Sequence, residues 1–146
     1  MANICKAAES AEDTKLDADF TGMTFQRIDH AIAMGALLTA HHLDAKAIVA
    51  MTESGSTALW MSRHRIHIPI YAVTAQVATQ RKLCLYRNVQ PLLMEMNNDR
   101  DTALAATESE LKKRGIFQTG DVYAITGGEP MGAPGGTNML KICRVS

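Results

Sequence analysis

Short apolar runs recur along the chain, each bounded by polar residues or glycine. Three of them, KAIVAM, IPIYAVT and DVYAIT, are rich in β-branched residues and predict buried strands. The run VQPLLMEM predicts a further strand with a less regular pattern. The C-terminal run MLKICRV alternates imperfectly, with one charged residue on each face. It therefore predicts a last strand at a sheet edge, where both charges reach water.

Longer segments between these runs have the spacing of helices. Helices are predicted from Ile28 onward, from about Ser56 to Arg65, and over AQVATQRKLCLY. The segment DRDTALAATESELKKRG is the clearest helix, because acidic residues begin it, basic residues end it and Gly115 follows. The first stretch, AAESAEDTKLDADFTGM, is small, acidic and weakly patterned, which indicates an exposed leader or a connection from a preceding domain.

The helix from Ile28 is apolar nearly all round. Ile32 and Gly35 follow helical spacing on one face, while Leu37 and Leu38 make the other side apolar too. Such a helix is usually covered on two sides. A sheet can cover one side. Either another domain or subunit covers the other side, or the helix lies centrally in the core of a monomer.

Strands that alternate with helices predict an α/β domain with a mostly parallel sheet and helices on both faces. In such sheets, ligands bind beyond the carboxyl ends of the strands, in the loops that lead into helices. Two notable loops follow predicted strands: TESGST after KAIVAM, and GGEPMGAPGGTN after DVYAIT. Both are therefore expected at the ligand-binding end of the sheet.

The composition narrows the class of function. The 146 residues suffice for one domain with a proper core. Basic and acidic residues both number 15, and this balance argues against a nucleic-acid or acidic-membrane binder. Three widely spaced cysteines without a CxxC pair indicate reduced thiols, hence a cytoplasmic location. No run approaches the ~20 apolar residues that a membrane helix needs.

The loop TESGST carries the strongest candidate chemistry. Its hydroxyl side chains, the flexible backbone of Gly55 and the start of the following helix together suit a phosphate group. The same pattern describes a plain helix N-cap, which contributes ~1 kcal/mol and needs no ligand. The carboxylate of Glu53 also opposes a doubly charged ligand. Taken alone, the pattern favours the N-cap.

The glycine-rich segment from Gly127 to Asn138 is the second candidate. It either closes over a ligand as a lid or simply connects two strands. It lacks a GxGxxG pattern that opens a helix, which excludes a dinucleotide-binding loop there. No paired carboxylates, nucleophile context or metal cluster accompanies either loop. The sequence therefore predicts a candidate binding site and no catalytic apparatus.

Other reactive side chains have structural explanations. The basic segment SRHRIHIP indicates a solvated helix end rather than an anion site. His41 and His42 are about 100° apart on a helix and cannot readily share a metal ion. Cys84 and Cys143 are expected to pack against apolar neighbours rather than to act as nucleophiles.

Several segments together resemble the C-terminal domain of pyruvate kinase. They occur in the family's order from about Asp29 to the C-terminus, and their combination is specific although each piece alone is weak. The preceding DADFTG is similar to the bridge that enters this domain from the family's (β/α)8 barrel. The matching segments are HAIAMGALLTA, AKAIVAMTESGSTALWMSRHR, IPIYAVT, LYRNVQPLL, KKRGIFQTGDVYAITGG and GGTNMLKICRV.

The resemblance implies a three-layer α/β/α domain over residues 28–146, with a five-stranded, mostly parallel sheet whose last strand is antiparallel. Residues 1–27 are then a linker from the barrel. In the family, this domain holds an allosteric effector and helps to build a tetramer. One loop grips the effector phosphate and the glycine-rich loop closes over it, which reverses the preference for the N-cap. The residues so implied are Thr52, Glu53, Ser54, Gly55, Ser56 and Thr57 at the phosphate, and Gly127, Gly128, Gly135, Gly136 and Thr137 in the effector loop.

Departures from the family pattern limit which class of effector the site is expected to bind. Members that bind fructose 1,6-bisphosphate tend to place basic or aromatic groups in the second loop and on the helix before GD. Here that loop has Glu129 and neither Arg nor Lys, and the helix position that aligns with the family's arginine is near Ala103. The expected effector is therefore a sugar monophosphate or an AMP-like molecule and not a bisphosphate. The alternative is that the site is no longer used.

The resemblance also implies that the catalytic barrel of the enzyme is not part of this sequence. In the family, phosphate passes from phosphoenolpyruvate to ADP on the barrel, which needs ~250 residues and holds magnesium and potassium ions. This chain is therefore expected to be inactive alone, to hold no cofactor, and to partner the barrel of the same enzyme and other copies of itself. An initial Met before a family-like linker favours an excised domain. The alternatives are a stand-alone phosphometabolite-binding module and a purely structural tetramerisation domain.

Overall fold

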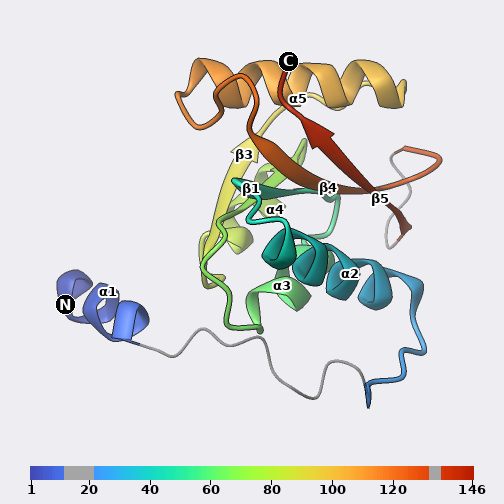
Figure 1. The fold of residues 1–146 in the computed structure, drawn as a ribbon. Coiled ribbons are helices and arrows are strands. Elements are labelled where there is room, and N and C mark those ends of the chain that lie inside the picture. Colours follow the sequence, from blue (N-terminus) through green and yellow to red (C-terminus); the bar gives the residue numbers. More distant parts are fainter. Residues whose placement is uncertain (12–21, 132–135) are drawn as a thin grey trace.

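The computed structural model describes residues 1–11, 22–131 and 136–146, in which strands and helices alternate (Figure 1). The alternation from β1 to β4 confirms the predicted α/β class. In chain order the elements are α1 (Ala2–Ala11), α2 (Ile28–His42), β1 (Ala47–Met51), α3 (Ser56–Ser62), β2 (Ile70–Thr74), α4 (Val77–Leu83), β3 (Val89–Leu93), α5 (Arg100–Lys113), β4 (Val122–Gly128) and β5 (Thr137–Arg144).

The strands form one five-stranded sheet in the order β3-β2-β1-β4-β5. Strand β1 lies at the centre, where Ile48 pairs in parallel with Ile70 of β2 and Ala124 of β4. Strand β3 is parallel to β2, and β5 is antiparallel to β4. The mostly parallel sheet with an antiparallel last strand at one edge is therefore confirmed.

Helices cover both faces of the sheet and complete three layers (Figure 1). Successive side chains of a strand point to opposite faces, so Ile48 and Val49 of β1 belong to different hydrophobic clusters. Ile48 packs in the cluster that contains Leu37 of α2, together with residues of α3 and α4. Val49 packs in the cluster that contains Leu111 of α5. The central strand is thus buried on both sides, which explains its continuous apolar run.

Among the described residues, other elements cover helix α2 on one side and leave the opposite side open. Its buried positions include Ala33, Met34 and Leu37, which face the sheet and α3. Ile28 is 69% exposed and Leu38 is 39% exposed, so an apolar strip faces outward. The alternative of a helix enclosed in the core of a monomer is therefore not what the structure contains.

Two helices are shorter than predicted. Helix α3 ends at Ser62 instead of Arg65, and α4 ends at Leu83 although the apolar pattern continues to Tyr86. After α4 the amides of Leu85 and Tyr86 bond to carbonyls three residues back, which is the tighter turn that often ends a helix. Pattern alone does not distinguish these turns from a continuing α-helix.

Helix α1 forms where only an exposed, weakly patterned leader was expected. Four of its ten residues are alanine, the best helix former. Its described side chains are all exposed. The described start of the segment is thus helical and exposed, and residues 12–21 of the predicted leader lie outside the described residues.

The prediction that Cys84 packs in apolar surroundings is wrong. Cys84 is exposed at the end of α4, where its Sγ contacts the Gln80 carbonyl at 3.4 Å. Cys143 is half-buried and packs against the cluster on the α5 side of the sheet, as predicted.

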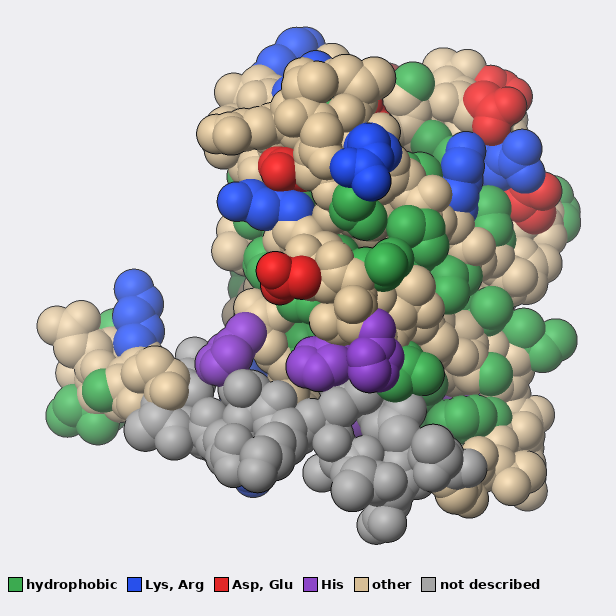
Figure 2. Space-filling model, in the orientation of Figure 1, with side chains coloured by type: hydrophobic (Ala, Val, Ile, Leu, Met, Phe, Trp, Pro, Cys, Tyr) green, Lys and Arg blue, Asp and Glu red, His purple; other side chains and the backbone are tan. Residues whose placement is uncertain are grey.

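The surface mixes charges of both signs. Figure 2 shows Lys and Arg side chains interspersed with Asp and Glu over the upper part of one face, and histidines gathered lower down. On this face, charges of both signs are therefore mixed, in keeping with the net charge of zero.

Candidate functional site

The two loops identified in the sequence meet at the carboxyl end of the sheet. The first follows β1, which ends at Met51, and the second follows β4, which ends at Gly128. Because β1 and β4 are adjacent and parallel, these ends lie side by side. This is the end of the sheet at which ligands bind in open α/β domains.

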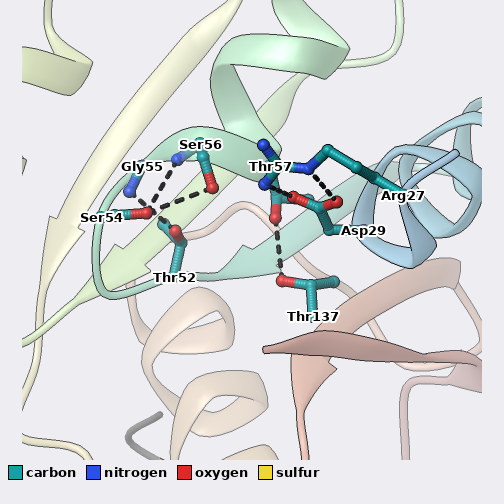
Figure 3. A network of polar contacts seen from close by, with 8 residues as sticks. All are labelled: Arg27, Asp29, Thr52, Ser54, Gly55, Ser56, Thr57 and Thr137. Atoms are coloured by element: carbon teal, nitrogen blue, oxygen red, sulfur yellow. Dashed lines mark hydrogen bonds and ion pairs between the residues drawn. The ribbon is translucent and has the colours of Figure 1, made fainter. Parts of the chain in front are cut away.

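The loop between β1 and α3 is curled by its own hydroxyl groups (Figure 3). The hydroxyl oxygen of Thr52 accepts the amide of Gly55 at 2.8 Å. The oxygen of Ser54 accepts the amide of Ser56 at 3.4 Å, and its hydroxyl donates to the Ser56 oxygen at 3.2 Å. The result is a compact turn with two adjacent serine hydroxyls on one side.

Gly55 is required at the centre of this turn. Its φ is +83°, in the left-handed region that L side chains rarely adopt, and an added Cβ would lie 3.3 Å from Leu83 Cδ2 of α4. Gly55 is also the N-cap of α3 and so provides no side-chain cap. Because glycine holds the N-cap position, the Ser and Thr residues of the loop are not explained as N-cap side chains. The seven-residue α3 also contributes only a short helix dipole.

A buried hydrogen bond joins the two loops. The hydroxyl oxygens of Thr57 and Thr137 lie 2.8 Å apart, although the residues are 80 positions apart in the sequence (Figure 3). Thr57 is 2% exposed and Thr137 is 9% exposed. Because a buried hydroxyl without a partner is costly, this bond holds the start of β5 against the start of α3.

The two loops enclose a small cavity of about 30 Å3. Its volume exceeds that of a single water site but is far below that of a sugar phosphate. Glu53 is the only charged residue among the described residues that line it. The lining residues are Met51, Thr52, Glu53, Ser54, Ser56, Met96, Gly128, Met131, Gly136 and Thr137.

The predicted effector-loop residues fall into three groups. Gly128, Gly136 and Thr137 line the cavity, and a Cβ on Gly128 would lie 2.6 Å from the Gly136 carbonyl oxygen, so only glycine fits. Gly127 is buried within β4 and does not line the cavity. Gly135 lies outside the described residues.

The start of the second loop is held in place by polar contacts. Glu129 donates its amide to Asn138 Oδ1 at 2.9 Å, and Asn138 Nδ2 donates back to the Glu129 carbonyl at 2.8 Å. The Glu129 carboxylate pairs with Arg100 of α5 at 3.3 Å. Glu129 is therefore occupied by a neighbouring cation and points to α5 rather than lining the cavity.

Helix α4 contacts the first loop through two residues that sequence reasoning missed. Thr79 donates its hydroxyl to the Glu53 carbonyl at 2.7 Å, and Lys82 Nζ donates to the Ser54 carbonyl at 3.0 Å. They lie 26 and 28 residues beyond their acceptors, outside any recognisable motif. The only hint in the sequence was the place of α4 in the chain, since it follows β2, the strand next to β1.

An ion pair stabilises the start of α2. Arg27 donates two hydrogen bonds to the Asp29 carboxylate, at 3.0 and 2.7 Å (Figure 3). Burial alone would raise the pKa of Asp29, but the hydrogen bonds and charge of Arg27 outweigh it and lower that pKa. An anionic side chain in the first turn also complements the helix dipole.

A larger groove of about 800 Å3 lies between α5 and β5, away from both loops. Several of its polar groups already have hydrogen-bond partners. Glu108 accepts a hydrogen bond from Tyr123 at 2.8 Å, Lys112 donates to the Ser146 carbonyl, and Arg144 donates to the Gly120 carbonyl. Among its cations, Lys112 and Arg144 are therefore already bonded to backbone carbonyls.

The part of the chain that the structure describes has neither a metal-binding cluster nor a membrane-spanning helix. No group of three or more His, Cys, Asp and Glu side chains there is positioned to hold a metal ion. None of the described helices has the length and apolarity needed to cross a membrane.

Comparison with known proteins identifies the family. Residues 30–143 match the family described as pyruvate kinase, alpha/beta domain. Pyruvate kinase of Buchnera aphidicola subsp. Acyrthosiphon pisum (strain APS) is 38% identical over 146 residues, which cover 99% of this chain and 30% of that protein. Pyruvate kinase of Staphylococcus aureus (strain USA300) is 39% identical over 143 residues, which cover 97% of this chain and 24% of that protein.

A solved structure has the same fold. The crystal structure of a pyruvate kinase from Cryptosporidium parvum superposes with a TM-score of 0.82 at 24% identity and covers 98% of this chain but 28% of that one. The chain thus spans between 24% and 30% of the length of these relatives. On the family match and the shared fold, the chain belongs to the pyruvate kinase family and corresponds to its C-terminal α/β domain.

Proposed function

We propose that this chain is the regulatory and oligomerisation domain of a pyruvate kinase and binds a phosphorylated effector at the loop from Thr52 to Thr57. The observation that carries the proposal is the Thr57–Thr137 hydrogen bond, which joins two distant loops around a cavity at the carboxyl end of the sheet. Ligands of α/β domains bind at this end. The Ser56 hydroxyl accepts from Ser54 and keeps its own hydrogen to donate to a phosphate oxygen.

The charges favour an effector with one phosphate. Among the described residues, no Arg or Lys lines the cavity, and its only charged residue is Glu53. The nearby Arg100 already pairs with Glu129. A second phosphate would therefore meet carboxylates, with no Arg or Lys among the described lining residues to clamp it. A sugar monophosphate or an AMP-like ligand fits this arrangement better than a bisphosphate.

Binding requires the cavity to widen. The cavity of about 30 Å3 holds water but not a sugar ring. Met96 and Met131 form part of its wall, and methionine side chains repack easily. An effector that binds the widened cavity better than the narrow one shifts the population toward the widened form.

The proposal extends to the complete enzyme. There the barrel, with its magnesium and potassium ions, converts phosphoenolpyruvate and ADP to pyruvate and ATP in cytoplasmic glycolysis, and the isolated chain is inactive. The outward apolar strip of α2, which includes Ile28 and Leu38, and the edge strand β5 are suited to contacts between copies in a tetramer. Effector binding then biases attached barrels through the assembly.

Thermal unfolding against a ligand panel tests the effector site. The panel contains ribose 5-phosphate, glucose 6-phosphate, AMP, fructose 1,6-bisphosphate and inorganic phosphate. A ligand at about 100 times its dissociation constant adds ~2.7 kcal/mol of stability. We expect a monophosphate to raise the midpoint in the wild type, and Ser54→Ala or Thr57→Ala to abolish the shift. Ser109→Ala, an exposed serine on α5, is the matched control and should keep it.

The absence of any shift would contradict the effector site. It would leave the purely structural tetramerisation domain as the better account. In that case sedimentation velocity of the wild type and of Leu38→Glu tests assembly separately, because a charge on the apolar strip of α2 disfavours contact between copies.

A further inference from the structure

The proposed phosphate loop has an unbalanced charge. A phosphate monoester carries close to two negative charges at pH 7. Glu53 contributes a further negative charge, and no cation lines the cavity among the described residues. The carboxylate of Glu53 and a phosphate in the same small cavity repel each other unless a cation offsets their charges. Such a cation has to come from beyond the cavity wall.

Lys82 brings a cation to this loop from α4. Its Nζ donates a 3.0 Å hydrogen bond to the carbonyl oxygen of Ser54, whose side chain lines the cavity. An ammonium group has three donors, so this bond leaves others for a ligand oxygen. The Lys82 side chain is exposed, and its flexible stem lets the ammonium turn toward a new partner.

Helix α4 also sets the direction of the loop's peptide groups. Thr79 and Lys82 hold two successive carbonyls, those of Glu53 and Ser54, toward α4. In a trans peptide the C=O and the following N–H point in opposite directions. The amides of Ser54 and Gly55 therefore point away from α4, where the Gly55 amide donates to Thr52 Oγ1.

The close approach of α4 depends on Gly55. A Cβ at this position would lie 3.3 Å from Leu83 Cδ2 and 3.5 Å from Thr79 Cγ2. Glycine thus brings the backbone of the loop against the helix that carries Lys82. The lysine is next to Leu83 in the sequence, so the packing fixes where its ammonium reaches the loop.

We propose that Lys82 is a phosphate-binding residue of this site, with Thr79 as a positioning residue. The ammonium turns from the Ser54 carbonyl to the phosphate of the effector and offsets the charge of Glu53. Because ammonium is a point charge and not a planar fork, it recognises the phosphate group and tolerates varied sugars. This inference rests on the proposed function and names a ligand class, phosphate monoesters.

Isothermal titration of the whole 146-residue chain with ribose 5-phosphate, and separately with inorganic phosphate, tests the proposal. We compare the wild type with Lys82→Met, Lys82→Arg and Arg81→Met. Arg81 is the exposed neighbour on the same helix, so its variant removes the same charge without the loop contact. We expect Lys82→Met to weaken binding about tenfold, in line with the loss of a charge-assisted hydrogen bond.

The other variants separate binding from structure. Lys82→Arg should bind within about threefold of the wild type, and Arg81→Met should bind like the wild type. The unliganded unfolding midpoint of Lys82→Met should stay unchanged, and its affinity should depend less on salt. Equal binding by Lys82→Met, or an equal loss in Arg81→Met, would overturn the role of Lys82 and leave the effector site standing. A wild type that binds neither ligand would overturn both.

Discussion

The hydrogen bond between Thr57 and Thr137 can be tested by removing each hydroxyl without changing the shape of the side chain. Thr57→Val leaves the buried Thr137 hydroxyl without its partner, 80 residues away in the sequence. An unpaired buried hydroxyl costs about 1–3 kcal/mol. A domain of about 150 residues loses roughly 2–4 °C of midpoint for each kcal/mol. We therefore expect a fall of about 2–12 °C.

The assay is a double-mutant cycle with urea unfolding, followed through the fluorescence of the single Trp60. Thr57→Val together with Thr137→Val removes both hydroxyls, so the pair should lose less stability than the sum of the single losses, by about 1 kcal/mol. Thr57→Ser keeps the hydroxyl and is the control. Strictly additive losses would refute a bond between the two loops.

Three further changes test the fold around the site. Gly55→Ala should lower the unfolding midpoint, because an alanine at φ +83° is strained and crowds Leu83. Leu111→Ala should cost about 2–5 kcal/mol in urea unfolding, because Leu111 is fully buried under the sheet. Glu108→Gln should flatten the acid side of the stability–pH curve. Burial alone would raise the pKa of Glu108, but bonds from Tyr123 and the C-terminal residue lower it below 4.5, so its stabilisation is present above that pH and is lost as pH falls through the folded-state pKa.

The sheet was predictable from the sequence because its central strands are buried on both faces. All five residues of β1 and all five of β2 are buried, so each strand is a continuous apolar run. The ends of α3 and α4 were not predictable, since the turns at Arg63 and Leu85 keep the helical spacing of apolar residues. Helix α1 was missed because its alanine-rich segment favours a helix through propensity, and its described side chains are all exposed, so no buried face marks it.

The meeting of the two loops was also predictable, because the carboxyl ends of adjacent parallel strands share one edge. The contacts of Thr79 and Lys82 were not, since they depend on how closely α4 approaches the loop at Gly55. The small volume of the cavity was equally hidden. It depends on the side-chain packing of Met96 and Met131, which no local pattern specifies.

The most direct test of phosphate binding at the Thr52–Thr57 loop is an amide NMR titration of the isotope-labelled chain with ribose 5-phosphate. The account predicts saturable shifts that are largest at the amides of Ser54, Ser56 and Gly136, and that are lost in Ser54→Ala. Shifts centred on Lys112 and Lys141 in the groove between α5 and β5, or no saturable shift at all, would contradict it.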